Sequence, residues 1–409
     1  MPNPNTNFRN SNGTDLGNIL ITKDYLMSVY PQIAGQLITP ELWVWGFNSF
    51  FSALGVNDLN NRTTPVTTFA GGANWKQIAC GGLHTAAIKT DGTLWIWGAG
   101  SVGRLGDNTS TNRSTPVTTF SGGTNWKQIG LGNACAHSAA IKTDGTLWVW
   151  GFNPTGQLGD NTTTNRVTPI TTFSGGTNWK QVSAGYRHTA AIKTDGTLWT
   201  WGRNLDGECG NNTVAQRNTP ITTFAGGTNW KQVSCGRDHT VAIKTDGTLW
   251  AWGRNAYAAL GDNTTTQRNT PITTFSGGTN WKQVSAGYRH TAAIKTDGTL
   301  WTWGSNAYAQ MGDNTTVNRS TPVTTFGGGN TWKQVASGGR HTMATKTDGT
   351  LWVWGSNSAT GSVSGQLGTN DTLNKSTPVT TFAGGNTWKQ VSASNHSAAI
   401  ETSDDLQGI

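Results

Sequence analysis

Charged residues and cysteines are both scarce in this chain, and each shortage excludes a class of protein. Charged residues make up 12% of the 409 residues, about half the usual share of a soluble domain. The four cysteines stand far apart without a CxxC pair, in a chain large enough to bury its own core. We therefore expect neither a disulfide framework nor a zinc site.

Long hydrophobic runs are also missing. No run approaches the roughly 18 apolar residues of a membrane span, and the polar start of the chain lacks the apolar stretch of a secretory signal. We therefore predict no membrane insertion and no signal peptide. The net charge of +8 suggests nucleic acid at first, but the basic residues are spread evenly over the chain, so no specific nucleic-acid binding is expected.

Signatures of enzymes and of metal sites are absent too. The sequence contains no GxSxG, HExxH or P-loop, and its Asn- and Asp-rich GDNTTTN stretches lack the order and the terminal Glu of an EF-hand. Asp and Asn in such stretches are typical of side chains that cap turns. We predict a protein that is not an enzyme and that holds no metal or cofactor.

Tryptophan and glycine, by contrast, are abundant, and the tryptophans reveal a repeat. The pentad LWxWG ends at seven glycines from Gly46 to Gly355, with spacings of 51 to 53 residues, and a second marker, WKQ, also occurs seven times. Three tryptophans in each of seven units account for all 21. The seven histidines likewise fall one to a unit. The chain is therefore an array of seven near-identical units.

Each unit reads as four short strands. In residues 179–224, runs rich in Val, Ile, Thr and Trp are bounded by Gly, Asn and Asp, and Asp195-Gly196 is a tight-hairpin signal. Four antiparallel strands in about fifty residues match one blade of a β-propeller. The predicted fold class is all-β: a seven-bladed β-propeller with four antiparallel strands per blade.

The two ends of the repeat array predict how the ring closes. The chain enters the repeat midway, at residues 42–46, and leaves it midway, after 388–409, so the N-terminal strand supplies what the C-terminal end lacks. We expect the N- and C-terminal strands to pair in one blade, which removes open edges. This divides the chain into a segment of residues 1–40, either docking on an assembly or strapping the rim, and a propeller of residues 41–409.

These residues also carry a family resemblance. The stretch 150–173, WGFNPTGQLGDNTTTNRVTPITTF, and the stretch 184–196, AGYRHTAAIKTDG, resemble the repeat of the regulator of chromosome condensation family. The resemblance implies a seven-bladed propeller. Its members include exchange factors for small GTPases, chromatin binders, an ultraviolet photoreceptor and a bacterial enzyme inhibitor. Within the family, the resemblance links light reception to a cluster of GWRHT turns. This chain instead has GYRHT at 185–189 and 287–291.

The repeats differ from one another mainly at one end of each unit. The turns that precede each histidine and the loops that follow each LWxWG share one face of an antiparallel blade, and they vary, whereas the TDG turns of the other face barely change. Loops on a rigid scaffold commonly build recognition sites, and Arg and Tyr are enriched at interface hot spots. The predicted partner-binding residues in these loops are Arg104, Tyr186, Arg187, Arg203, Arg237, Asp238, Arg254, Tyr257, Tyr288, Arg289, Tyr308 and Arg340.

The repeated histidines and tryptophans are interpreted as structural. Each histidine opens a strand at the same place and precedes Thr or Ser, which indicates a hydrogen bond that serves the repeat. The paired tryptophans of LWxWG lie at i and i+2 on one strand face, as expected of a core between blades.

The first forty residues lie outside the repeat and suggest a docking role. Thr22 could cap a short helix that ends before Pro31, and Thr22, Tyr25, Leu26 and Tyr30 are the candidate docking residues. Few charges, many Thr and Asn, and near-identical units are similar in style to appendage proteins of tailed phages. The leading hypothesis is a virion or surface-displayed propeller that binds a host-surface receptor or a neighbouring structural protein.

Two alternatives remain open. One is a cytoplasmic adaptor or regulator that binds a protein partner, such as a GTPase or an enzyme that it inhibits. The other is a propeller that binds a carbohydrate, so a glycan is a possible ligand.

Overall fold

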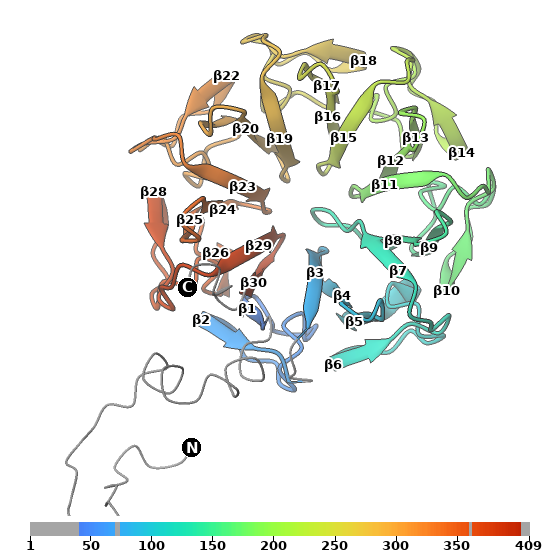
Figure 1. Ribbon diagram of the computed structural model, residues 1–409, viewed down its shortest axis with the longest axis horizontal. Coiled ribbons are helices and arrows are strands. Elements are labelled where there is room, and N and C mark those ends of the chain that lie inside the picture. The colour runs from blue at the N-terminus through green and yellow to red at the C-terminus, as the bar shows by residue number, and fades with distance from the viewer. Residues whose placement is uncertain (1–40, 70–73, 360–361, 402–409) are drawn as a thin grey trace, which may run out of the picture. The chain divides into compact units, whose positions relative to one another are not determined.

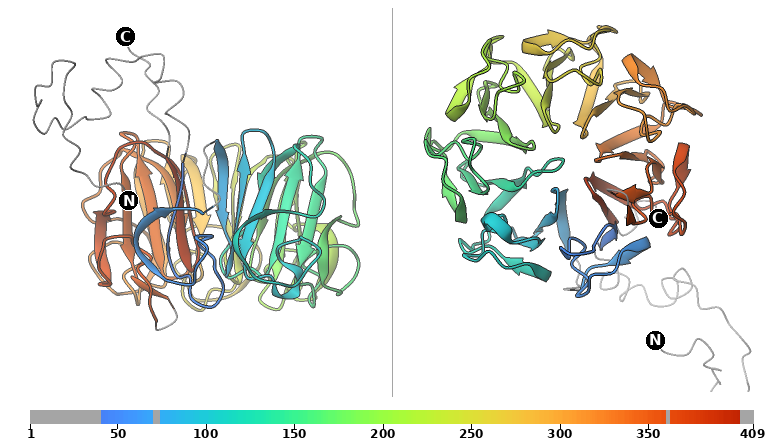
Figure 2. Two further views of the ribbon diagram at one scale, coloured as in Figure 1. Left: turned by 90° about the horizontal axis from the view of Figure 1, so that it is seen from below. Right: turned by 180° about the vertical axis from the view of Figure 1, so that it is seen from behind.

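The computed structural model describes residues 41–69, 74–359 and 362–401, which form a ring of seven four-stranded antiparallel sheets around a central opening (Figures 1 and 2). The seven-bladed propeller predicted from the repeat is thus confirmed. The predicted docking segment 1–40, with Thr22, Tyr25, Leu26 and Tyr30, lies outside the described residues. Within the described residues, no helix is long and apolar enough to cross a membrane.

Every blade uses its four strands in the same order from the centre outwards. The inner strands are β3 (Trp75–Cys80), β7 (Trp126–Ile129), β11 (Trp179–Ala184), β15 (Trp230–Cys235), β19 (Trp281–Ala286), β23 (Trp332–Ser337) and β29 (Trp388–Ala393). The second strands are β4 (His84–Lys89), β8 (His137–Lys142), β12 (His188–Lys193), β16 (His239–Lys244), β20 (His290–Lys295), β24 (His341–Lys346) and β30 (His396–Glu401).

The third strands carry LWxWG, and they are β5 (Leu94–Gly98), β9 (Leu147–Gly151), β13 (Leu198–Gly202), β17 (Leu249–Gly253), β21 (Leu300–Gly304), β25 (Leu351–Gly355) and β1 (Leu42–Gly46). The outer strands are β6 (Arg113–Thr118), β10 (Arg166–Thr171), β14 (Arg217–Thr222), β18 (Arg268–Thr273), β22 (Arg319–Thr324), β28 (Lys375–Thr380) and β2 (Arg62–Thr67). They begin two residues before the predicted TP step. A 3-10 helix, η1 (Ser101–Gly103), and a small hairpin, β26 (Ser358–Ala359) with β27 (Ser362–Val363), lie in the loops.

The closing blade joins both ends of the repeat array, as predicted. Its strand order is β2-β1-β30-β29, and β1 pairs antiparallel with β30 from Leu42 opposite Ile400 to Gly46 opposite His396. The indole N–H of Trp43 also donates to the carboxylate of Glu401, at 3.0 Å. The chain therefore closes its own ring with a hydrogen-bonded strand pair.

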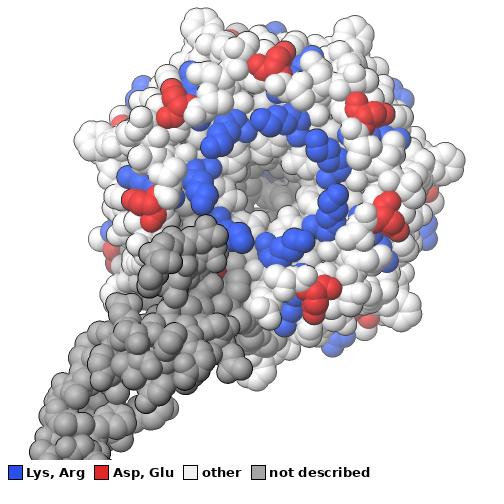
Figure 3. Space-filling view, viewed as in Figure 1, with Lys and Arg blue, Asp and Glu red and all other residues white. Residues whose placement is uncertain are grey.

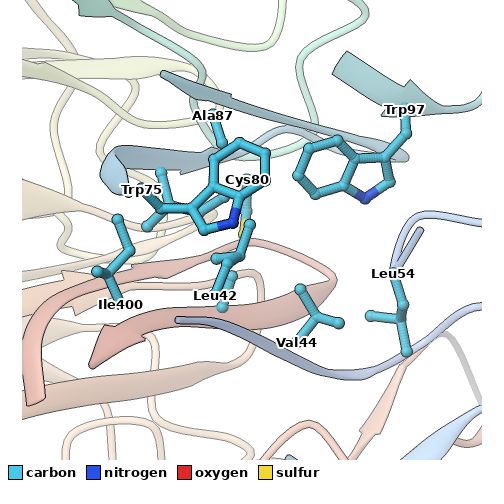
Figure 4. Close-up of a cluster of buried hydrophobic side chains, with 10 residues drawn as sticks. Leu42, Val44, Leu54, Trp75, Cys80, Ala87, Trp97 and Ile400 are labelled. Atoms are coloured by element: carbon cyan, nitrogen blue, oxygen red, sulfur yellow. The ribbon is translucent and has the colours of Figure 1, made fainter. Parts of the chain in front are cut away.

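The hydrophobic core consists of clusters between adjacent blades. Figure 4 shows the cluster at the junction of the closing blade and the next one, where Leu42 and Ile400 pack with Trp75 and Trp97. The rings of Trp75 and Trp97 meet edge to face, with centroids 6.4 Å apart. Trp75 and Trp97 are at most 2% exposed, so the second tryptophan of LWxWG belongs to the core as predicted, whereas the first one, Trp95, is only partly buried against it.

The glutamine of each WKQ bonds neighbouring inner strands together. Gln283 Oε1 accepts the backbone N–H of Val335 in the next blade at 3.0 Å, and its Nε2 donates to the carbonyl of the same residue at 3.2 Å. The hydrogen bond from the backbone N–H to the glutamine Oε1 recurs at all seven blade junctions. Each inner strand has a free edge, and this glutamine satisfies backbone groups there.

The histidines also form a ring of bonds between blades. His137 Nε2 lies 2.8 Å from the hydroxyl of Thr189, which donates to the carbonyl of Gln157, and the indole of Trp201 donates to that same carbonyl. Because the hydroxyl gives its proton to the carbonyl, the imidazole must donate to the hydroxyl. Equivalent His-to-hydroxyl contacts occur at the other six junctions, so the histidines have the structural role that the sequence predicted.

Candidate partner-binding site

The predicted binding residues lie on two sets of connections that share one face of the ring. The turns between inner and second strands and the loops between third and outer strands form this face, here named the variable face. The TDG turns and the turns that enter each inner strand form the opposite, constant face. Turns of adjacent blades also bond to each other on the variable face, as Tyr186 N–H does to the carbonyl of Arg237 at 3.4 Å.

Arginine and tyrosine side chains stack alternately across three blades of the variable face. The guanidinium of Arg237 lies between the rings of Tyr186, at 5.2 Å, and Tyr288, at 4.6 Å. Arg289 continues the row, 5.3 Å from the ring of Tyr288 and 4.1 Å from that of Tyr257. We call Tyr186, Arg187, Arg237, Tyr257, Tyr288 and Arg289 the Arg/Tyr row.

The two ends of the row extend the same chemistry. Arg187 stacks on its neighbour Tyr186 at 4.8 Å and on Phe152 at 5.5 Å. Beyond the row, Arg340 stacks on Tyr308 at 4.5 Å. These side chains are partly buried rather than fully exposed, so their rotamers are restrained while one side still meets solvent.

Three carboxylates beside the row surround one arginine. Arg203 forms ion pairs with Asp206 at 2.8 Å, with Asp238 at 3.0 Å and with Glu208. Arg237 and Arg254 add two more ion pairs, 3.4 Å and 3.7 Å from Asp238. The carboxylate oxygens of Asp206, Glu208 and Asp238 lie within 4.8 Å of one another, as metal ligands would. Because Arg203, Arg237 and Arg254 supply three positive charges beside the three carboxylates, this cluster is an ion-pair network whose cations are guanidinium groups of the chain.

Burial controls the protonation of this network. Burial raises the pKa of Glu208 to about 7, although Arg203 works against it, and burial also raises the pKa of Asp238. For Arg203, burial by itself would lower the pKa, but the carboxylates of Glu208 and Asp238 outweigh it and raise the pKa. The arginine therefore stays charged, and it holds two rim loops together.

Arg104 differs from the other predicted residues. It is only 8% exposed, and its guanidinium donates to the carbonyl and the hydroxyl of Ser101 at 3.1 Å each. Burial lowers its pKa. Arg104 therefore packs within its own loop and takes no part in the stacking of the Arg/Tyr row.

Sequence reasoning missed a loop that crosses the central channel. In the blade of β7, residues 130–136 replace the short turn of the other blades, and Asn133 donates to the carbonyls of Ala286, at 3.0 Å, and Ser337, at 2.7 Å, on the far side of the ring. Figure 1 shows this loop reaching toward the centre. The signal was the length of LGNACAH, two residues more than CGGLH.

A hollow lies beside this loop on the variable face. It has a volume of about 220 Å³ and is lined by Ala134 of the crossing loop, Tyr288 of the row, Arg340 and Asn395. The row and the hollow are therefore continuous through Tyr288. A partner side chain inserted there would meet an aromatic ring and a guanidinium together.

Comparison with known proteins identifies similar chains. Residues 41–400 match the family described as RCC1-like domain. The chain is 32% identical over 333 residues to the ultraviolet-B receptor UVR8 of Arabidopsis thaliana, which covers 80% of this chain and 74% of the receptor. It is 30% identical to the mitochondrial RCC1 domain-containing protein RUG3 of the same plant, over 68% of this chain and 64% of that protein.

A solved structure extends the comparison of the fold. The Saccharomyces cerevisiae protein Prp20p superimposes with a TM-score of 0.77 at 19% sequence identity, over 91% of this chain and 93% of that one. The structure report of Prp20p describes binding to Gsp1p and to histones. At this identity the likeness concerns the shared propeller fold.

Proposed function

We propose that this chain, which belongs to the RCC1-like domain family, is a regulator that binds a protein partner through the Arg/Tyr row of its variable face. Among the hypotheses drawn from the sequence, the relatives support the intracellular adaptor or regulator better than a virion or surface-displayed protein. UVR8 is a receptor, and Prp20p binds Gsp1p and histones. An intracellular location accompanies the proposal.

The stacking of Arg237 between Tyr186 and Tyr288 is the observation that carries the proposal. Long side chains lose rotamer entropy when a partner immobilises them. Side chains that already stack on each other are partly ordered in the free protein, so they lose less entropy on binding. Tyrosine and arginine are also the residue types that dominate interface hot spots. The row is therefore suited to bind a protein surface with little rearrangement.

The other candidate roles have less support from the residues. Six of the seven partly buried tryptophans have a lysine over the ring, as Lys295 Nζ lies 4.3 Å from the ring of Trp301, and this lysine competes with a sugar for the ring face. In the GYRHT turns tyrosine stands where the photoreceptor resemblance requires tryptophan. We therefore propose neither carbohydrate binding nor light reception.

Affinity capture with paired variants tests the proposed function. Wild-type chain and the variants Tyr288→Ala and Lys295→Ala would be immobilised and exposed to extract of the organism's own cells. We expect at least one protein to be captured by the wild type and by Lys295→Ala and to be lost with Tyr288→Ala. For that protein, Tyr288→Ala should weaken binding by about 2 kcal/mol, or roughly thirtyfold.

The control residue, Lys295, lies on the constant face. Its substitution removes a charge without changing the Arg/Tyr row. Equal capture by wild type and Tyr288→Ala, with loss in Lys295→Ala, would place the binding surface on the opposite face. Both variants must melt as cooperatively as the wild type, so that loss of capture reports binding.

A further inference from the structure

The second residue of every inner strand is an exposed lysine, and together these lysines surround the central opening on the constant face. They are Lys76, Lys127, Lys180, Lys231, Lys282, Lys333 and Lys389. We call them the lysine ring. Figure 3 shows basic side chains gathered around the opening and acidic side chains farther out. The seven lysines are evenly spaced along the chain, but the fold gathers them around one opening. A count of charges along the sequence did not reveal this cluster.

The lysine ring lacks the partners that other basic residues of the propeller have. Among the described residues, its members form no ion pair and stack on no aromatic ring, whereas Lys193 lies 4.5 Å from the ring of Trp199 and Arg166 pairs with Asp160 at 2.7 Å. Inner strands of adjacent blades come within 8 Å of each other between Cα atoms. The fold thus places positive charges of adjacent blades around one narrow opening, which favours an anion there.

The channel that the lysine ring surrounds holds a polar cavity. A cavity of about 160 Å³ extends along the channel from Gln283, next to Lys282, to Asn133 of the crossing loop. Serines of five inner strands line it: Ser183, Ser234, Ser285, Ser337 and Ser392. The channel inside the lysine ring therefore has polar walls.

Acidic residues outside the ring limit the size of the ligand. Each of the six TDG turns exposes one aspartate, for example Asp195 and Asp297, and these turns join second and third strands, farther from the axis than the lysines. An extended polyanion lying across the face would meet this outer band of negative charge. A compact anion on the axis would meet only the lysines.

We propose that the lysine ring binds one compact molecule with several phosphate groups, seated over the mouth of the channel. Lysine is a common phosphate ligand, and several ammonium groups around one axis can each meet a different phosphate. This site lies on the face opposite the Arg/Tyr row, so it goes beyond the proposed function and is independent of it.

Titration calorimetry with inositol hexakisphosphate tests the site. We expect one molecule to bind per chain, and the triple variant Lys180→Gln/Lys282→Gln/Lys389→Gln to bind about tenfold more weakly or worse, since charge-assisted hydrogen bonds are lost. The matched control, Lys193→Gln/Lys295→Gln/Lys346→Gln, removes the same charge from the same face and should bind like the wild type. Circular dichroism melting shows whether both variants remain folded.

Further ligands and one more variant complete the design. Replacing the same three ring lysines with arginine keeps the charge and should retain binding, which separates loss of charge from loss of fold. Inorganic phosphate should bind far more weakly than the hexakisphosphate. Equal weakening in the two glutamine variants, several ligands per chain, or tighter binding of a short DNA duplex or a polyglutamate peptide would each overturn the proposal.

Discussion

At the scale of single residues, the repeated positions of the sequence are mostly bonds between blades. Gln283 bridges to Val335, and His137 bridges through Thr189 to the carbonyl that also receives the indole of Trp201. The histidines could be interpreted correctly from their constant position before Thr or Ser. The glutamine role could not, because its partners are backbone groups 52 residues away, and backbone groups leave no mark in a sequence.

Substituting one bridging glutamine should destabilise the whole ring. In Gln283→Ala, the N–H and the carbonyl of Val335 lose their partner at a part-buried position, so the free energy of unfolding should fall by about 1–3 kcal/mol. Urea denaturation measures the change. Lys282→Ala, one residue earlier and exposed, serves as the control and should change stability by less than about 0.5 kcal/mol. Equal effects of the two substitutions would contradict the bridging role.

The buried histidines predict a loss of stability in acid. Burial lowers the pKa of His137 and His188 to about 3 and that of His239 to about 4. In the unfolded chain these groups take up protons near pH 6.5, so between about pH 6.5 and 3 the unfolded state binds more protons and stability falls as pH falls. Melting temperature measured from pH 8 to pH 4 should decrease below about pH 6.5.

Substituting one histidine measures its share of the pH dependence of stability. In His188→Gln, one titrating group is removed, and the pH dependence of the unfolding free energy should become shallower by up to about 1.4 kcal/mol per pH unit. Stability that stays flat from pH 7 to pH 5 in the wild type would contradict the assignment of neutral, buried histidines.

At the scale of elements, strands followed from the sequence and loops did not. Alternating Val, Ile, Thr and Trp with Asp-Gly turns predicts the strands, because burial on a sheet face leaves a period of two residues. The crossing loop 130–136 obeys no such period. Its course depends on Asn133 reaching carbonyls of two distant blades, and only its extra length was visible.

The crossing loop can be tested through its asparagine. In Asn133→Ala, the two hydrogen bonds across the channel disappear and the carbonyls of Ala286 and Ser337 lose a donor, so unfolding should cost about 1–3 kcal/mol less. Hydrogen exchange should also rise in residues 130–136. The exposed Asn330 is a suitable control, and unchanged exchange in the loop would show that other contacts hold it.

The sequence could predict which residues belong to the candidate site. It could not predict which of them contact one another. Variable loops rich in Arg and Tyr identified Tyr186, Arg237 and Tyr288, which the fold then stacks into one row. Arg104 has the same residue type and the same kind of loop, yet it is buried against Ser101. Whether an arginine faces solvent depends on the packing of its loop, which residue type does not report.

At the scale of the whole molecule, ring closure depends on a strand pair formed by the two ends of the repeat array. Deleting residues 1–46 removes β1, opens the sheet that holds β2 and β30, and should lower the melting temperature sharply. Deleting residues 1–30 leaves β1 in place and should keep the folded propeller. Equal melting temperatures for the two truncations would contradict closure by β1.

The central claim is that a protein partner meets the Arg/Tyr row, and hydrogen–deuterium exchange on the complex with a captured partner tests it most directly. The account predicts that binding slows exchange in the turns and loops at 185–188, 203–208, 236–238, 254–258 and 287–289, while the TDG turns, including 195–196 and 297–298, exchange as in the free chain. Slowed exchange confined to the TDG turns, with the Arg/Tyr row unchanged, would contradict it.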